Sequence, residues 1–96
     1  MADETPIAPR INVKYGDEEI KGRYANLVRI THTREEMVFD FINVVPPHGA
    51  ATARVITSPG HAKRLLRALA NHVEQYEKQF GPIVEAPEPG SQTPVN

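Results

Sequence analysis

Three basic residues, Lys63, Arg64 and Arg67, lie in the first turns of a long predicted helix. A helix N-terminus carries partial positive charge, so each basic side chain there is destabilising by about a few tenths of a kcal/mol or more. An anion, phosphate or nucleic-acid backbone, held by these side chains and by the free N–H groups of Gly60 and His61, would offset that cost. We favour the alternative in which the three side chains are solvated or paired with acidic residues of a partner chain.

The other residues with chemical potential show no catalytic or metal-binding pattern. The histidines, His32, His48, His61 and His72, lack the spacing of metal ligands. The chain has no cysteine, no nucleophile elbow around Ser58 and no glycine-rich phosphate loop. We therefore predict no catalytic, cofactor-binding or metal-binding residues, no cofactor and no enzyme activity.

Asp40 lies between Phe39 and Phe41 and allows two interpretations. A buried acid with a raised pKa would be a candidate catalytic group. The structural alternative pairs Asp40 with Arg29, with Arg54 also in reach, and needs no catalysis. We favour the ion pair, since a buried pair can fix register and partner choice.

These residues must be positioned by a few strands and one helix. Alternating apolar and polar residues between turn signals predict four strands, at residues 11–15, 24–32, 37–45 and 51–57. A helix follows at residues 58–80, because Ser58 suits the N-cap and Pro59 the first helical position. Gly81 and the proline after it end the helix.

A hairpin loop at residues 33–36 sets the strand register, with Arg29 opposite Asp40. One face of the sheet is then strongly apolar, with residues Val28, Ile30, Phe39, Phe41, Ala51, Ala53 and Val55. Its small alanines leave room for a helix, so we expect the C-terminal helix to dock there.

The opposite face of the same strands mixes apolar and charged residues. A solvated face of an antiparallel sheet is normally polar, whereas an apolar patch that contains paired charges is typical of a protein interface. The residues of this predicted oligomer interface are Leu27, Arg29, Asp40, Ile42, Val44, Arg54 and Ile56.

The predicted helix carries apolar residues at alternating spacings of four and three, which is a heptad seam. The seam residues are Ala62, Leu66, Leu69, Val73, Tyr76 and Phe80. At 1.5 Å per residue the helix spans about 30 Å. It is longer than the predicted strands need, so its far end could reach a second subunit.

The 96-residue chain divides into a body and two tails. Residues 1–8 and 83–96 contain prolines and lack apolar periodicity, so we predict disordered tails around a single β-β-β-β-α domain at residues 9–82. Four of the 12 acidic residues lie in these tails, which leaves the body 11 basic against 8 acidic residues, a net charge of +3. That charge is far below that of a dedicated nucleic-acid binder.

The absence of cysteine removes disulfides and zinc-thiolate sites as sources of stability. A single core of this size contributes only about a few kcal/mol of net stability, so self-association is the remaining common remedy. No apolar run could span a bilayer, and the N-terminus lacks the pattern of a signal peptide. We expect a cytoplasmic protein with no membrane partner.

Four short segments carry a family resemblance: Gly22-Arg-Tyr-Ala-Asn26, Phe39-Asp-Phe41, Ala53-Arg-Val-Ile-Thr-Ser-Pro59, and Tyr76-Glu77 with Phe80-Gly81. The chain resembles a short bacterial and archaeal family, the domain-of-unknown-function family numbered 3467. The likeness covers about residues 10–82 and is most specific at the strand-to-helix joint. The family has no assigned activity, so the resemblance implies a single compact module and carries over no site residue.

The sequence therefore predicts an α+β fold, in which an antiparallel meander of three to four strands is followed by one long C-terminal amphipathic helix. We expect a non-enzymatic homo-oligomeric interaction or structural module whose partner is a second copy, and which could also bind another protein. The alternative is a nucleic-acid-associated regulator that uses Lys63, Arg64 and Arg67. A small-molecule sensor with an anion at the helix start is the weakest hypothesis.

Overall fold

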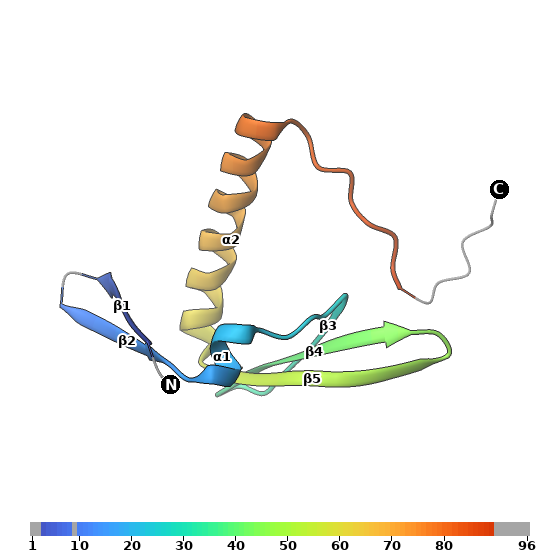
Figure 1. The fold of residues 1–96 in the computed structure, drawn as a ribbon. Helices are drawn as coiled ribbons and strands as arrows, with labels where there is room; N and C mark the ends of the chain where they lie inside the picture. The colour runs from blue at the N-terminus through green and yellow to red at the C-terminus, as the bar shows by residue number, and fades with distance from the viewer. Residues whose placement is uncertain (1–2, 9, 90–96) are drawn as a thin grey trace.

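The main sheet of the protein is an antiparallel meander, and a long helix follows it (Figure 1). The structure, a computed structural model, describes the backbone of residues 3–8 and all atoms of residues 10–89. The elements are β1 (Asp3–Ala8), β2 (Ile11–Tyr15), α1 (Asp17–Lys21), β3 (Leu27–His32), β4 (Met37–Val45), β5 (His48–Thr57) and α2 (Pro59–Phe80). Strands β1 and β2 form a two-stranded sheet, and β3, β4 and β5 form the meander. This architecture confirms the predicted α+β fold class.

The N-terminal region is more structured than the sequence predicts. Strand β1 occupies Asp3–Ala8, where we predict a disordered tail, and it pairs antiparallel with β2. Such pairing depends on backbone N–H and C=O groups, which a polar sequence supplies as well as an apolar one. The short helix α1 was also not predicted. Its first turn holds Asp17, Glu18 and Glu19, which suit the positive end of a helix, and Gly22 ends it at a φ of 75°.

Strands β3 and β4 pair in the predicted register, with Arg29 opposite Asp40. The regular strand β3 begins at Leu27, later than predicted, because a side chain takes over the pairing before that residue. The Asn26 Nδ2 group donates to the Val44 carbonyl at 3.0 Å, and Asn26 Oδ1 accepts from the Val44 N–H at 2.8 Å. The amide of Asn26 thus replaces a backbone partner at the end of the sheet.

A β-bulge interrupts the pairing of β4 with β5. Phe41 pairs with Ala53 and the next residue, Ile42, pairs with Ala51, so Thr52 is the extra residue. The Thr52 hydroxyl donates to the Phe41 carbonyl at 3.1 Å. Because a bulge shifts side-chain alternation by one residue, Ala51 lies on the face of Ile42. Our prediction that Ala51 shares the apolar face of Phe41 is therefore wrong.

Helix α2 has the predicted bounds and caps. Ser58 Oγ accepts a hydrogen bond from the His61 N–H at 3.1 Å, and Pro59 occupies the first helical position. At the other end the Gly81 N–H donates to the Glu77 carbonyl at 2.9 Å, with Gly81 at a φ of 98°. Both ends of the helix are thus satisfied by nearby residues.

Helix α2 rises steeply from the end of the sheet instead of lying along its apolar face (Figure 1). Only its first turns approach β3 and β4, through Ala62, Leu65, Leu66 and Leu69. Our prediction that the helix docks on this face is wrong for the rest of its length. Ser58 alone separates β5 from α2.

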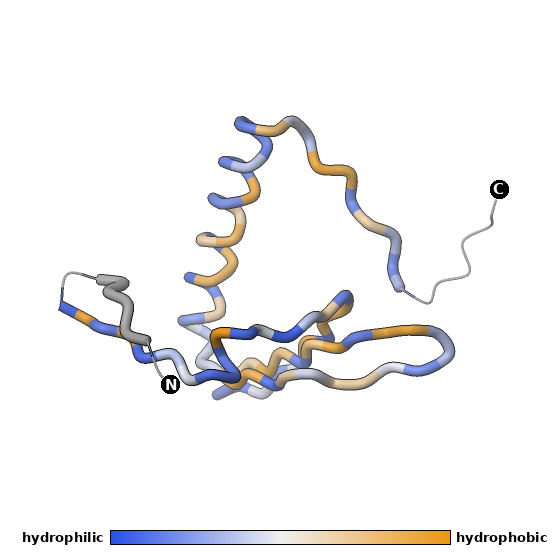
Figure 2. Tube along the Cα trace, in the orientation of Figure 1, coloured by the Kyte–Doolittle hydropathy of each residue, from blue (hydrophilic) through white to orange (hydrophobic). Residues whose placement is uncertain are grey.

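Large apolar side chains remain exposed on the sheet and along α2, where they alternate with polar ones (Figure 2). Among residues 10–89 no hydrophobic side chain is buried, and the only buried side chain is that of Asp40, which is 6% exposed. The chain exposes 8554 Å² in all, whereas a compact monomer of 10.7 kDa exposes about 5,500 Å². The described part of a single chain therefore has no hydrophobic core.

Candidate functional site

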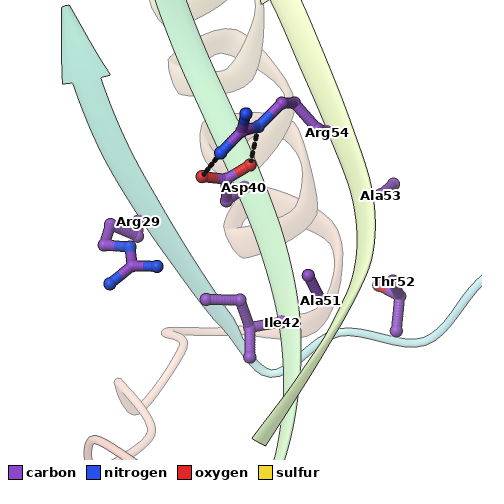
Figure 3. Close-up of a pocket in the computed structure, with 7 residues that line it drawn as sticks. All are labelled: Arg29, Asp40, Ile42, Ala51, Thr52, Ala53 and Arg54. Carbon is purple, nitrogen blue, oxygen red and sulfur yellow. Dashed lines mark hydrogen bonds and ion pairs between the residues drawn. The ribbon is translucent and has the colours of Figure 1, made fainter.

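One face of the meander gathers all seven residues of the predicted interface, and we call it the charged-pair face. It is formed by Leu27, Arg29, Asp40, Ile42, Val44, Arg54 and Ile56. The strand pairing places Leu27 beside Ile42, and it aligns Arg29, Asp40 and Arg54 in one row across three strands. Because side chains alternate along a strand, these rows share one side of the sheet. Helix α2 lies behind the opposite side (Figure 3).

The centre of the charged-pair face is an ion pair between Asp40 and Arg54 (Figure 3). Arg54 donates from Nε to Asp40 Oδ1 at 2.7 Å and from Nη2 to Oδ2 at 3.0 Å, a bidentate geometry. The hydrogen bond from Arg54 lowers the pKa of Asp40, and it outweighs the burial that raises this pKa. The charges of Arg54 and Arg29 lower the Asp40 pKa further, and the hydrogen bond to Asp40 raises the pKa of Arg54.

The direct partner of Asp40 differs from the one we favoured. Arg29 stands opposite Asp40 in the register, yet its guanidinium points away from the carboxylate (Figure 3). The fork of Arg54, which approaches from β5, satisfies both carboxylate oxygens instead. Arg29 therefore acts on Asp40 only through its charge.

The charged-pair face combines a carboxylate of lowered pKa with an exposed guanidinium. The lowered pKa of Asp40 keeps its carboxyl group ionised at neutral pH. A general acid or base, by contrast, needs a pKa near the working pH. The Arg54 side chain is 65% exposed and covers the carboxylate, so its own outer side is open to a partner. A cavity of about 270 Å³ at this place is also bounded by Arg29, Ile42 and Ala51.

A second apolar surface lies on the other side of the sheet, on the face that the sequence predicts to be apolar. It is a groove of about 270 Å³ between the first turns of α2 and strands β3 and β4, and we call it the apolar groove. Its walls are Ile30, Met37, Phe39, Ala62, Leu65, Leu66 and Leu69. The heptad seam indicated its helical wall, but only the steep departure of α2 leaves the space open.

The far half of α2 continues the seam beyond the apolar groove. Tyr76 is 51% exposed and Phe80 is 66% exposed. Their ring centroids lie 4.9 Å apart, so the two rings form one aromatic block. Within residues 10–89 more than half of each of these two residues is therefore left uncovered.

The predicted anion site at the start of α2 is only partly formed. The His61 N–H donates to Ser58 Oγ and is therefore not free, contrary to our prediction. Arg64 Nη2 lies 2.9 Å from His61 Nδ1, and Lys63 and Arg67 are exposed on the same helix. Within residues 10–89 none of these three cations forms an ion pair with a carboxylate.

The structure also bears on metals and membranes. His32 ends β3, His48 begins β5, and His61 and His72 lie on α2. In the described part of the chain no three His, Asp or Glu side chains lie close enough together to hold a metal ion. No described helix has both the length and the apolar character needed to cross a bilayer.

Fold and site together define a class of small α+β protein, a meander with one projecting helix and with its apolar surfaces exposed. Residues 1–85 match the family described as "Protein of unknown function (DUF3467)", and the chain belongs to this family. The match confirms the predicted resemblance and extends it over strand β1. No curated protein and no solved structure matches the chain.

Proposed function

We propose that the protein is a non-enzymatic, homo-oligomeric interaction or structural module of the cytoplasm. The observation that carries this proposal is that no hydrophobic side chain among residues 10–89 is buried. Burial of apolar surface is the dominant favourable term in folding, so a chain that buries so little by itself must gain this term by association. The absence of cysteine supports a reducing compartment.

The exposed area supports an extensive interface. The chain exceeds the area of a compact monomer by about 3,000 Å², to which residues 81–89 contribute a part. Obligate homodimers bury about 2,000–5,000 Å² in total. Two copies therefore have enough surface for an obligate contact.

The charged-pair face is the surface that we assign to this association. A two-fold contact brings the same patch of both copies together. Leu27, Ile42 and Ile56 would supply apolar area, and the Asp40–Arg54 pair would fix the register of the two faces.

Light scattering coupled to size-exclusion chromatography tests the proposal. At micromolar concentration we expect a mass of at least twice the 10.7 kDa of one chain. A stably folded species of 10.7 kDa would contradict it.

The second candidate is a nucleic-acid-associated regulator, and the exposed cations Lys63, Arg64 and Arg67 are the observation that favours it. In an oligomer these cations could form one stripe that holds phosphates. If so, Lys63→Glu with Arg67→Glu abolishes the binding of labelled DNA or RNA at low salt. If the wild type shows no salt-sensitive binding, this candidate is excluded.

A further inference from the structure

We propose that helix α2 of one chain docks antiparallel along α2 of a second copy, so that the partner's Tyr76 and Phe80 fill the apolar groove. The inference rests on the proposed self-association and assigns it a second surface, on the side of the sheet away from the charged-pair face.

The seam residues fit this arrangement layer by layer. With the two-fold axis beside Asn71, Ala62 lies opposite the partner's Phe80, which sets the smallest seam residue against an aromatic ring. Leu66 then lies opposite the partner's Tyr76, and Leu69 opposite the partner's Val73. All six seam residues thereby obtain an apolar counterpart, as the a and d positions of an antiparallel pair require.

The apolar groove supplies the space for the aromatic block. Ala62 and Leu66, which face the partner's rings in this register, form one wall of the groove, and Phe39 forms part of the other. Docking would bury Tyr76 and Phe80, which are 51% and 66% exposed in the single chain. Aromatic side chains of this kind dominate the energetics of interfaces.

Charge also selects the antiparallel direction. The first turns of α2 carry Lys63, Arg64 and Arg67, whereas Glu74 and Glu77 lie in its second half. Antiparallel packing places Lys63 beside the partner's Glu77 and brings the basic first turns towards the negative end of the partner helix, which offsets the cost of cations at a helix N-terminus. Parallel packing would instead bring both sets of cations together.

Because the chain contains no cysteine, single cysteines report the direction of packing through a short thiol-specific cross-linker. We expect Ala70→Cys, close to the two-fold axis, to give covalent dimers. Ala62→Cys should not link to its own copy, which lies about 27 Å away along the axis at 1.5 Å per residue. Chains with Lys63→Cys mixed with chains with Glu77→Cys should link, although neither should link alone. Asn71→Cys, on the outer side of the helix, is the control.

A second measurement uses the aromatic block itself. Phe80→Asp should raise the dissociation constant of the oligomer about tenfold or more, because the interface loses an aromatic anchor and gains a charge in an apolar groove. Gln79→Asp is the matched control and should have little effect.

The outcomes separate this inference from the function on which it rests. Self-linking of Ala62→Cys would show parallel helices, and an oligomeric wild type with no linking at Ala70→Cys would show that α2 lies outside the interface. Either result overturns the inference and leaves self-association intact. A wild type that is a folded monomer overturns both.

Discussion

The meander and helix α2 differ in how many of their polar groups and apolar side chains find partners within the chain. Within the meander each strand pairs with its neighbour, and Asp40 and Arg54 satisfy each other across two strands. Helix α2 satisfies its backbone and its caps, yet its seam from Leu66 to Phe80 remains exposed. Contacts within the chain therefore satisfy the polar groups of the sheet, whereas the apolar side chains of α2 remain exposed.

The largest effect should come from a charge placed on the charged-pair face. Ile42→Asp or Leu27→Asp would remove apolar area and bury an unpaired carboxylate twice in a two-fold interface, at a cost of about several kcal/mol. We expect light scattering to show that the wild-type oligomer dissociates to a species of lower mass, or circular dichroism to show that the variant is unfolded. Arg34→Ala, in the hairpin loop, should keep the oligomer. An unchanged mass for Ile42→Asp would remove this face from the interface.

Removal of the Asp40 charge should have a smaller effect than a new charge on the charged-pair face. The folded pKa of Asp40 lies below the ordinary value of 3.8, because Arg54 donates hydrogen bonds to it. The stabilisation is therefore full above the ordinary value and is lost as the pH falls through the lower folded pKa. We expect Asp40→Asn to lower the unfolding midpoint at pH 7 and to approach the wild type in acid.

Urea unfolding at a series of pH values and one protein concentration measures this dependence. Arg54 and Arg29 are the charged groups that act on Asp40, and Glu36→Gln in the hairpin loop serves as the control. Parallel profiles for wild type and Asp40→Asn would show that the pair does not contribute.

Loss of the N-cap of α2 should have an effect of intermediate size, smaller than a charge on the charged-pair face and larger than loss of the exposed ion pair on α2. Ser58→Ala removes the acceptor for the His61 N–H, which typically costs about 1 kcal/mol of unfolding free energy. Ser58→Thr keeps an acceptor and should lose less. If Ser58→Ala and Ser58→Thr unfold at the same urea concentration, the cap is not a source of stability.

The smallest effect should come from the exposed pair on the outer side of α2. Lys78 Nζ lies 3.4 Å from Glu74 Oε2 in the favourable order along the helix. Glu74→Gln should therefore cost only about 0.3 kcal/mol, and high salt should remove the difference. A loss of several times that size in urea unfolding would mean that Glu74 contacts another chain.

Much of the sheet could be predicted because strand register depends on local information. The period of two and a short hairpin loop were enough to place Arg29 opposite Asp40 and to group the charged-pair face. The bulge at Thr52 could not be predicted, since no glycine or proline marks it. Both arginines adjoin Asp40 in the register, so only side-chain geometry decides that Arg54 is the partner.

The helix shows the other limit of prediction from sequence. Ser58, Pro59 and Gly81 fixed where α2 begins and ends, because capping depends on residues close in the chain. Its direction depends on the backbone of one joint residue, which composition and periodicity do not encode. The apolar groove results from that direction, so the sequence could indicate residues of both walls but not the open space between them.

The concentration dependence of thermal unfolding tests the central claim most directly, because a fold that depends on a second copy gains stability by mass action. We predict that the melting midpoint rises steadily as the wild-type concentration increases from about 1 to 100 μM, together with a mass of at least twice 10.7 kDa. A cooperative transition whose midpoint is independent of concentration, from a species of 10.7 kDa, would contradict the claim.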